Sequence, residues 1–476
     1  MRYLLIFLVV FSAFDSWAKI STPSEWETLL KSNDVSLVIT RLNDSAVLFE
    51  KDPNKLLSPA SVTKIATSVT ALKKFTPNHM FRTKLYYTGK RNASQIQGDL
   101  LVKGGGDPLL TSEKLWQVAA DIRNLGISEF TGDIVIDDSL FEDSQRDASR
   151  VSGALASEHA YDAPISALAI NFNTVALSVA PNPNLKQPAY VSIDPYPLGN
   201  ITIQNKTNTS TSSAKKIQIT RTSNGEKTLF LAEGLISQNA EIYKIYRSID
   251  NTVDINGEYL RSFLNSAGVK VHGKVKSGKI PSNATQLIVI EGYPVSRIVH
   301  GLNKYSNNYV ADTLVKDLGA SFNSKGTLQS GVTYINKFLR EEVGIKDNFQ
   351  LPSGSGLDHT TRFSAQQIDK ILNYAYKDMI IFPEFLASLA VAGVDGSLEK
   401  RFIMGPAKAM QGKLRAKTGT LTQPLSTSAI AGYYQHPKHG LLAFSLICNA
   451  KNNMKTSQAE QRALIDDSIT KILLAL

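Results

Sequence analysis

The chain has very little cysteine and histidine. Cys448 is the only cysteine among 476 residues, so an intramolecular disulfide is excluded. It follows an apolar, strand-like run over residues 444–447, and we expect a packed structural thiol rather than a catalytic one. Of seven histidines, only His436 and His439 lie close together, on a predicted turn where solvated side chains are expected. The sequence therefore predicts no metal site.

Long apolar runs are also scarce, and the one that stands out lies at the start of the chain. Residues 3–14 are apolar, Arg2 precedes them, and Ser16-Trp17-Ala18 offers a small-x-small cleavage site. This pattern predicts a secretory leader over residues 1–18, because the run is short for a membrane-spanning helix. A retained membrane anchor is the alternative. We expect a periplasmic or secreted protein.

Acidic residues are outnumbered by basic ones, which gives a formal net charge of +10. A basic surface suits an anionic polymer such as a cell wall, but solvated lysines would give the same total. The glycine cluster at residues 104–108 lacks the Gly-Lys-Ser/Thr ending of a phosphate loop, so a tight turn is expected there. At this length the chain should form two or three domains.

Most elements can be predicted from hydrophobic periodicity and turn residues. Strands are expected near residues 84–87, 99–102, 133–137, 189–193, 217–220, 228–231, 287–290 and 413–420, and in hairpins over 35–49 and 428–447. Helices are expected over 112–125, 241–267, 296–318 with a break at 306–308, and 459–476. Residues 204–213, crowded with Asn, Thr and Ser, should form an exposed loop in a small β-rich module. The fold class is α/β and multi-domain, with helices on both sides of a sheet.

The stretch around Ser61 and Lys64 is the first candidate for catalysis. Ser58 should cap a helix whose apolar residues recur on one face, and Ser61 and Lys64 then share a face. A neutral lysine can take the proton of a serine hydroxyl, and burial or a nearby cation would lower its pKa enough for that role. Ser-x-x-Lys also occurs at Ser212/Lys215, Ser213/Lys216 and Ser397/Lys400, where solvated helix turns are expected.

Two further motifs carry the rest of the expected chemistry. In Ser306-Asn307-Asn308, the Ser306 hydroxyl could pass a proton to a leaving amine, and the Asn308 amide could hold a peptide and the lysine. In a strand, Lys417 and Gly419 face the same side.

The strand motif suggests a role for each of its residues. Lys417 could supply a fixed positive charge, Thr418 could help it bind a carboxylate, and Gly419 could leave room for a substrate. The backbone N–H groups of Ser61 and Thr420 could form an oxyanion hole, which is worth about 3 kcal/mol per donor.

In this order the three motifs resemble those of the penicillin-recognising serine enzymes, and specifically the low-molecular-mass class C penicillin-binding proteins. Further matching stretches lie at residues 104–108, 163–168, 354–357, 392–398 and 417–421. The resemblance implies a β-lactamase/transpeptidase-like sheet-and-helix serine hydrolase domain with two inserted, mostly β domains. The expected division is a leader over 1–18, the hydrolase domain over 19–82 and 286–476, one insert over 83–170 and 246–285, and a second over 171–245.

The resemblance also implies an activity. Ser61, Lys64, Ser306, Asn308 and Lys417 would be catalytic in a D-Ala-D-Ala carboxypeptidase that also acts as a peptidoglycan endopeptidase. Penicillin would acylate Ser61. The implied partners are peptidoglycan and β-lactams as covalent inhibitors, with no cofactor, no nucleic acid and at most peripheral membrane contact.

The chain departs from the family pattern at several places. The centre of the second motif is often Asp and here is Asn307. The segment at residues 154–159 has neither the Trp nor the Asp of members that read diaminopimelate. Asp358-His359 stands where Ser-Arg is usual, with an arginine only at Arg362. The last two differences concern the side-chain end of the substrate.

Other functions would also be compatible with parts of this pattern. A class A β-lactamase shares the motifs but is far shorter, and a Ser-x-x-Lys carboxylesterase usually lacks Lys-Thr-Gly. A non-hydrolytic penicillin or peptidoglycan receptor would keep its acyl-enzyme and release no product. Turnover of a D-Ala-D-Ala peptide separates the receptor from the hydrolase.

Overall fold

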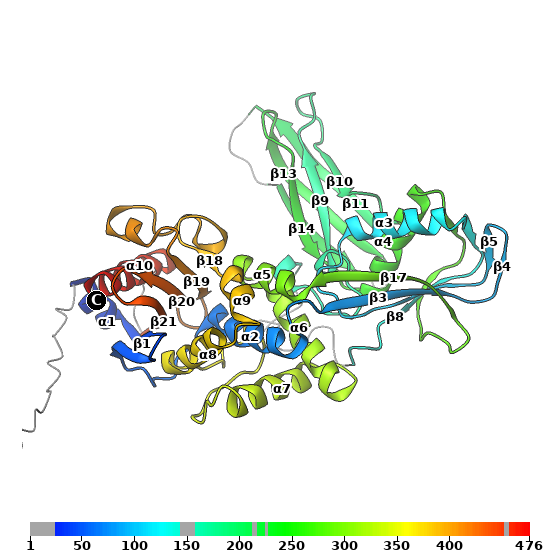
Figure 1. Cartoon of the computed structure of the whole chain (residues 1–476). Coiled ribbons are helices and arrows are strands. Elements are labelled where there is room, and N and C mark those ends of the chain that lie inside the picture. Colours follow the sequence, from blue (N-terminus) through cyan, green and yellow to red (C-terminus); the bar gives the residue numbers. More distant parts are fainter. Residues whose placement is uncertain (1–23, 143–157, 212–216, 224–226, 452–456) are drawn as a thin grey trace, which may run out of the picture.

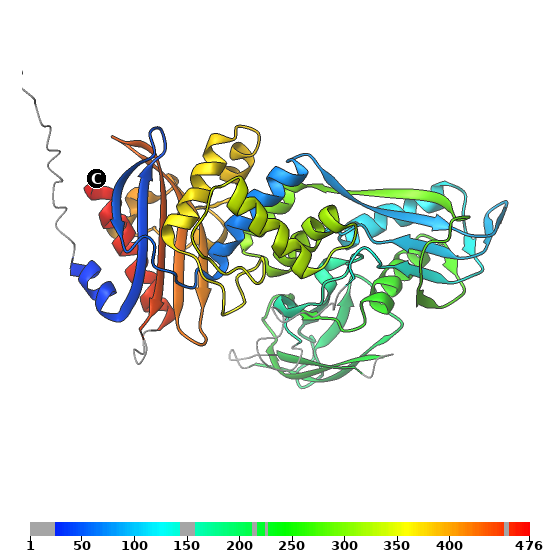
Figure 2. The ribbon, with the colours of Figure 1, turned by 90° about the horizontal axis from the view of Figure 1, so that it is seen from below.

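The computed structural model describes residues 24–142, 158–211, 217–223, 227–451 and 457–476, and the predicted leader lies outside these ranges. At one end of the molecule an antiparallel sheet is covered by helices on both faces (Figures 1 and 2). Its six strands, in spatial order, are β18 Ala390–Val391, β19 Leu414–Leu421, β20 Thr427–His436, β21 Gly440–Ala450, β1 Asn33–Arg41 and β2 Ala46–Lys51. The predicted hairpins over 35–49 and 428–447 are confirmed.

Two groups of helices sandwich this sheet. One face packs against α1 Ser24–Ser32 and α10 Gln458–Ala475. The other face carries a larger group, namely α2 Lys64–Phe75, α5 Val295–Tyr305, α6 Asn308–Asn323, α7 Leu328–Glu341, α8 Ala365–Lys377 and α9 Phe382–Ser388. Apolar side chains of this group form one continuous core that reaches the sheet through Ala429, Ala431 and Ala443.

The residues between the two halves of this body form an arm, defined here as residues 80–294 (Figure 1). It begins and ends in a long antiparallel pair, β3 Met80–Tyr87 and β17 Thr285–Pro294. These strands complete a five-stranded sheet with β6 Leu100–Lys103, β8 Ile134–Asp137 and β16 Val275–Ser277. A second sheet contains β4 Lys90–Asn92, β5 Gln95–Gln97, β7 Glu129–Phe130 and β15 Lys270–Val271.

Two helices and two three-stranded sheets complete the arm. The helices are α3 Ser112–Asn124 and α4 Thr252–Ser266, and they contact each other. One sheet has the order β10 Tyr190–Asp194, β9 Thr174–Ala180, β14 Tyr243–Ser248, and the other β11 Ile201–Ser210, β13 Thr228–Ser237, β12 Ile217–Ser223. The arm's sheets and helices share one apolar core.

Several local predictions need correction. Residues 201–210, expected in part as a loop, form β11, whose Thr207 and Thr209 side chains are buried. Residues 243–248, expected to be helical, form β14 before the helix begins at Thr252. His436 is 4% exposed rather than solvated, because its Nδ1 accepts hydrogen bonds from the amides of Lys438 and His439 in the turn.

Cys448 lies in β21 and is fully buried, as predicted. Burial raises the pKa of its thiol. Among the helices in the described part of the chain, none combines the length and apolar character that crossing a membrane requires.

Candidate functional site

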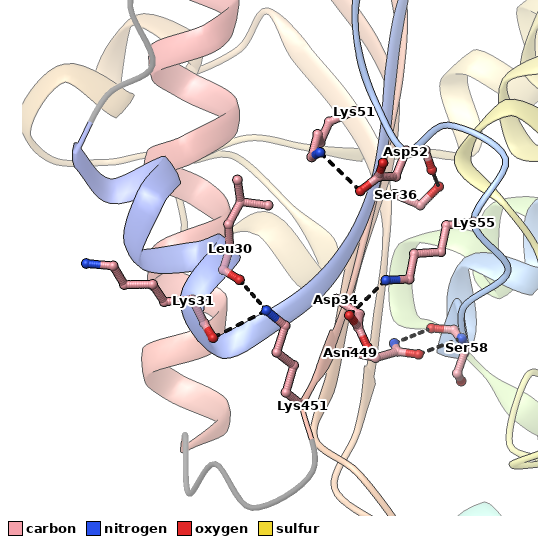
Figure 3. Close-up of polar contacts among 10 residues, drawn as sticks. All are labelled: Leu30, Lys31, Asp34, Ser36, Lys51, Asp52, Lys55, Ser58, Asn449 and Lys451. Atoms are coloured by element: carbon pink, nitrogen blue, oxygen red, sulfur yellow. Dashed lines mark hydrogen bonds and ion pairs between the residues drawn. The ribbon is translucent and has the colours of Figure 1, made fainter.

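Ser61 lies in a short 3₁₀ turn, Ala60–Thr63, directly before α2. The predicted Ser58 cap is wrong. The backbone N–H and C=O of Ser58 pair instead with the side chain of Asn449 on β21, which ties the turn to the sheet (Figure 3). Ala60 takes a left-handed conformation with a φ of 49°, a strained geometry for a residue with a Cβ. The strain is tolerated because the turn is held at both ends.

Helix α2 is buried on every side from Lys64 to Leu72, not on one face as predicted. The expected apolar residues Val62, Ile65 and Val69 are all fully buried. Lys64 is fully buried as well, and a lysine in such a place needs hydrogen-bond acceptors for its ammonium group.

Three acceptors surround the Lys64 amine. Its Nζ lies 2.8 Å from Ser61 Oγ, 2.7 Å from Asn308 Oδ1 and 2.5 Å from the backbone oxygen of Ser355. The structure thus brings together the first and second motifs, separated by about 240 residues in the sequence. No role was predicted for the Ser355 carbonyl, although residues 354–357 form one of the stretches that resemble the family.

The glycines beside Ser355 explain how its carbonyl reaches Lys64. A Cβ on Gly356 would lie 2.1 Å from the backbone oxygen of Ala60, and one on Gly354 would lie 2.3 Å from Val315. Gly354 is fixed further by a hydrogen bond from Thr67 Oγ1 to its carbonyl. Only glycine allows this loop to lie so close to the Ser61 turn and to α6.

The second motif occupies the sharp junction between α5 and α6. Ser306 is left-handed, with a φ of 57°, and ends α5. Asn307 is the N-cap of α6, and its side chain accepts a hydrogen bond from the amide of Val310. Aspartate and asparagine are equally good N-caps, so this role accounts for the departure from the family pattern at Asn307.

The third motif lies on β19, next to the Ser61 turn. Lys417 is fully buried, and its Nζ donates to Ser306 Oγ at 2.8 Å and to the backbone oxygen of Thr418 at 2.6 Å. Complete burial, followed by repulsion from Lys64, holds the pKa of Lys417 well below its usual range. The prediction of a fixed positive charge at Lys417 therefore took no account of the free energy needed to bury that charge.

Gly419 packs directly on the Ser61 turn. A Cβ at this position would lie 2.4 Å from the oxygen of Pro59 and 3.0 Å from the nitrogen of Ser61. Because Gly419 has no side chain, β19 can lie close to the turn. The predicted role of Gly419 was a different one, to leave room for a substrate. Thr420 follows at the same edge of the sheet.

Two groups of residues border the site. Thr418 Oγ1 donates to Ser397 Oγ at 2.8 Å, so the Ser397 turn borders the third motif. At the far end of β19, His359 and Arg362 line a small cavity of about 40 Å³ with Leu421 and Ser58. Among the described residues, the buried Ser58 hydroxyl in this cavity has no hydrogen-bond partner.

The remaining candidate motifs lie elsewhere or outside the described ranges. Lys276, whose Lys276-Ser277-Gly278 sequence is similar to the third motif, pairs with Asp133 on the arm. The Ser212 and Ser213 copies of Ser-x-x-Lys fall outside the described residues. Within the described ranges, no three histidine, cysteine, aspartate or glutamate side chains gather closely enough to hold a metal ion.

The fold is that of the penicillin-binding proteins. Penicillin binding protein 4 from Haemophilus influenzae superposes with a TM-score of 0.77 at 20% identity, over 96% of this chain and 99% of that one. A predatory peptidoglycan endopeptidase from Bdellovibrio bacteriovorus gives a TM-score of 0.54 at 14% identity, over 93% of each chain.

A family model described as the D-Ala-D-Ala carboxypeptidase 3 (S13) family matches residues 24–471, and the chain belongs to this family. A D-alanyl-D-alanine carboxypeptidase from an Actinomadura species is 29% identical over 422 residues, 84% of this chain and 75% of that protein. The DacB carboxypeptidase of Haemophilus influenzae is 22% identical over 96% of this chain and 94% of its own length. The predicted family and fold class are confirmed.

Proposed function

We propose that the protein is a serine D-Ala-D-Ala carboxypeptidase that also cleaves peptidoglycan cross-links, through an acyl-enzyme on Ser61. Membership of the family supports the activity. The observation that carries the choice of nucleophile is the buried Lys64 amine, 2.8 Å from the Ser61 hydroxyl. Each step below uses side chains and amides of this chain, so the proposal calls for no metal or cofactor.

The surroundings of Lys64 determine where its lone pair points. A neutral amine has two N–H donors and one lone pair, and the oxygens of Asn308 and Ser355 can only accept hydrogen bonds. When the two N–H groups donate to these two oxygens, the lone pair faces the Ser61 hydroxyl. Of the three contacts, this hydroxyl is the group with a proton to donate. Lys64 then takes this proton as Ser61 Oγ attacks the carbonyl carbon of the penultimate D-Ala.

Ser306 and Lys417 are placed to return a proton to the leaving group. The Ser306 hydroxyl accepts a hydrogen bond from Lys417, and Ser306 is partly exposed whereas Lys417 is buried. When the C–N bond breaks, Ser306 gives its proton to the departing amine and is reprotonated by Lys417. Lys417 and Thr418 also bind the substrate carboxylate. Water then hydrolyses the Ser61 ester: its proton restores Lys417 through Ser306, and Lys64 returns its proton to the Ser61 oxygen.

The oxyanion of the tetrahedral intermediate would be held by the backbone N–H groups of Ser61 and Thr420. The close approach of Gly419 to the nitrogen of Ser61 supports this role, because it brings β19 beside the turn. Fixed amides of this kind act without reorganisation during the reaction.

Arg362 and His359 are placed to meet the side-chain end of the stem peptide. They border the cavity that follows Leu421 along β19, beyond the Ser61 turn. Arg362 donates to the backbone oxygens of His359 and Thr361, which hold its guanidinium at this edge. A carboxylate on the side chain would be the matching group.

The same site accounts for β-lactams as covalent inhibitors, since they would acylate Ser61 without losing a leaving group. We place the protein in the periplasm or outside the cell, on the strength of the sequence pattern at residues 1–18. Peptidoglycan is the partner polymer, and the net charge of +10 suits it.

We also propose the predicted domain division, with a peptidase domain over 19–82 and 286–476 and inserts over 83–170 with 246–285 and over 171–245. The apolar cores support the predicted domain boundary on β3, because Phe81 belongs to the core of the helices and Leu85 to the core of the arm. At the other end of the arm, Ile290 belongs to the arm's core and Val295 to the core of the helices. The cores therefore favour a domain boundary between these two residues, a few residues after the predicted one.

The test is mass spectrometry of the purified protein incubated with cross-linked muropeptide dimers and, separately, with monomeric pentapeptides. We expect dimers to become monomers and pentapeptides to lose D-Ala, with both reactions absent in Ser61→Ala. Loss of D-Ala alone would restrict the protein to carboxypeptidase activity. Penicillin labelling of Ser61 with no change in either substrate would contradict the proposal and favour a receptor.

A further inference from the structure

An exposed tryptophan stands out on the arm, away from the Ser61 site. Helix α3 buries Leu115, Val118 and Ile122 in the arm's core, yet Trp116 on the same helix is 63% exposed. An indole is a large apolar surface to leave in water, and exposed indoles often mark binding sites. Trp116 is not needed for the packing of α3, so its exposure calls for a different explanation.

A hollow of about 310 Å³ lies beside Trp116. It runs between α3 and the end of β10, and Ser112, Glu113, Trp116, Asp194, Tyr196 and Phe263 contribute to its walls. The Tyr196 ring is held edge-on against Phe263, with their centroids 5.1 Å apart. One wall is therefore aromatic and fixed, while two carboxylates and a hydroxyl supply polar groups.

The surface continues from Asp194 across the sheet β10-β9-β14. The register places Asp194, Ala176 and Tyr246 in one row, and Ser192, Ser178 and Lys244 in the next. Side chains in these rows share one face of the sheet. Small residues of β9 thus lie between longer side chains on the outer strands.

This face carries exposed aromatic and polar groups together. Tyr246 and Tyr190 are 50% and 58% exposed, and both belong to the same face as Asp194. Lys244 pairs with Asp194 at 2.6 Å across the central strand. This sheet face, called the trough, has aromatic edges, small residues between them and fixed charges, and Asp194 joins it to the hollow at Trp116.

We propose that this trough and hollow bind a glycan strand of β-1,4-linked N-acetylhexosamines, a site distinct from the Ser61 cleft. Pyranose rings present apolar C–H faces that stack on aromatic side chains, and hydroxyls that hydrogen-bond to carboxylates. The combination of Trp116 and Tyr196 with Glu113 and Asp194 matches both needs. The inference rests on the proposed function for its choice of polymer, since peptidoglycan joins such strands to the stem peptides.

A glycan site on the arm would raise the local concentration of stem peptides at Ser61. Two contacts with one polymer make the second contact intramolecular. The expected consequence is specific: loss of the arm site slows cleavage of intact, insoluble peptidoglycan, but leaves penicillin acylation and cleavage of soluble pentapeptide unchanged.

The direct test is titration with the tetramer of β-1,4-linked N-acetylglucosamine, which contains no peptide. The chain has three tryptophans, Trp17, Trp26 and Trp116, so Trp17→Phe/Trp26→Phe leaves Trp116 as the one reporter. We expect a saturable change in its emission. By calorimetry, Trp116→Ala should weaken binding about tenfold or more, as loss of a central aromatic does. Phe322→Ala, which removes a 47% exposed aromatic side chain from α6, outside the arm, is the matched control and should bind normally.

Ser61→Ala should bind the tetramer as the unaltered protein does, so failure of the proposed peptidase chemistry would not affect this test. A flat titration would overturn the proposal, and so would equal affinities for Trp116→Ala and Phe322→Ala. Capture of a protein on this face without tetramer binding would also contradict it. If Trp116→Ala cleaved insoluble peptidoglycan as fast as the unaltered protein, the proposed increase in the local concentration of stem peptides would be contradicted.

Discussion

Lys64 combines complete burial with hydrogen bonds to neutral acceptors, an arrangement that lysines seldom adopt. No acidic side chain is among these three contacts of its amine. These contacts arrange the residue for proton transfer with Ser61. This arrangement depends on Ser355 and Asn308, which are far from Lys64 in the sequence.

Lys64→Met should slow acylation by penicillin by about 10²–10⁴-fold, the usual range for loss of a general base. Methionine keeps the volume and leaves the fold intact. Stopped-flow or mass-spectrometric labelling measures the rate. Lys73→Met is the matched control, because Lys73 lies on the same helix in an exposed pair with Asp378. Normal labelling of the Lys64 variant would contradict its role.

The buried Lys417 should lower the free energy of unfolding by an amount that depends on pH. Its folded pKa lies well below its unfolded pKa of about 10.4, so folding favours the neutral amine. The stability that this lysine contributes is present above the unfolded pKa and is lost as pH falls toward the folded pKa. Replacement by methionine should then stabilise the protein by about 1–3 kcal/mol near neutrality and by less at high pH.

Urea unfolding of Lys417→Met at about pH 6 and about pH 9.5 tests this difference, since only the lower pH lies well below the unfolded lysine pKa. Penicillin acylation of the same variant should be strongly reduced. A variant that is less stable than the unaltered protein at the lower pH would show that burial of the charge is not the dominant effect.

At the scale of elements, the junction between α5 and α6 shows how a motif residue can serve the fold. Asn307→Ala should cost about 1 kcal/mol, because the amide of Val310 loses its cap. Asn307→Asp keeps the acceptor and adds a charge that the helix N-terminus favours, so it should be as stable as the unaltered protein or a few tenths of a kcal/mol more stable. Urea unfolding distinguishes them, and equal losses in both variants would refute a capping role.

The contact between β19 and the Ser61 turn is the second test at this scale. Gly419→Ala places a methyl group 2.4 Å from the Pro59 oxygen, so the strand or the turn must move. We expect acylation to fall by about tenfold or more through displacement of the reacting groups. Gly301→Ala on α5, where a methyl group meets nothing within 4 Å, should acylate normally. Similar rates in both variants would show that the close approach is unimportant.

Elements with clear periodicity could be predicted from the sequence, and so could the three motifs. The hairpins over 35–49 and 428–447 are apolar, strand-like runs that end at turn residues. β11 could not be predicted because threonines such as Thr207 replace apolar residues on its buried side. The capping role of Ser58 failed for another reason: Asn449, 391 residues away, binds its backbone.

The site could be predicted as a set of residues but not as a geometry. Motif spacing indicated that Ser61, Lys64 and Asn308 belong together. Nothing in the sequence indicated that the Ser355 carbonyl directs Lys64, since any residue supplies a carbonyl. The burial of Lys417 depends on the packing of β19 between its neighbours, which periodicity alone does not reveal.

At the scale of the whole molecule, the arm joins the helical layer behind the Ser61 site. The turn after β6 carries Asp107 and contacts α6, where a Cβ on Gly106 would meet Asp317. Ile165 and Ala163 of the arm share an apolar cluster with Tyr309, one residue after Asn308. The arm is therefore packed against the element that carries the second motif.

Buried carboxyls at this junction should make it sensitive to pH. Burial raises the pKa of Asp107 to about 6, and burial with repulsion from Asp107 raises that of Asp317. A raised folded pKa means that folding favours the neutral acid, so stability is lost as pH rises through the folded value. Asp107→Asn keeps the acceptor for the amide of Leu109 and should add about 1–3 kcal/mol at pH 8 but little at pH 4. Thermal unfolding at both pH values checks this, and an equal gain at both would contradict it.

The central claim is that Ser61 is the nucleophile. The most direct measurement is intact-protein mass spectrometry after incubation with benzylpenicillin, followed by peptide mapping. We expect one adduct with the mass of the whole antibiotic, located on the peptide that contains Ser61 and absent in Ser61→Ala. An adduct on another residue, or one that persists in Ser61→Ala, would contradict the account.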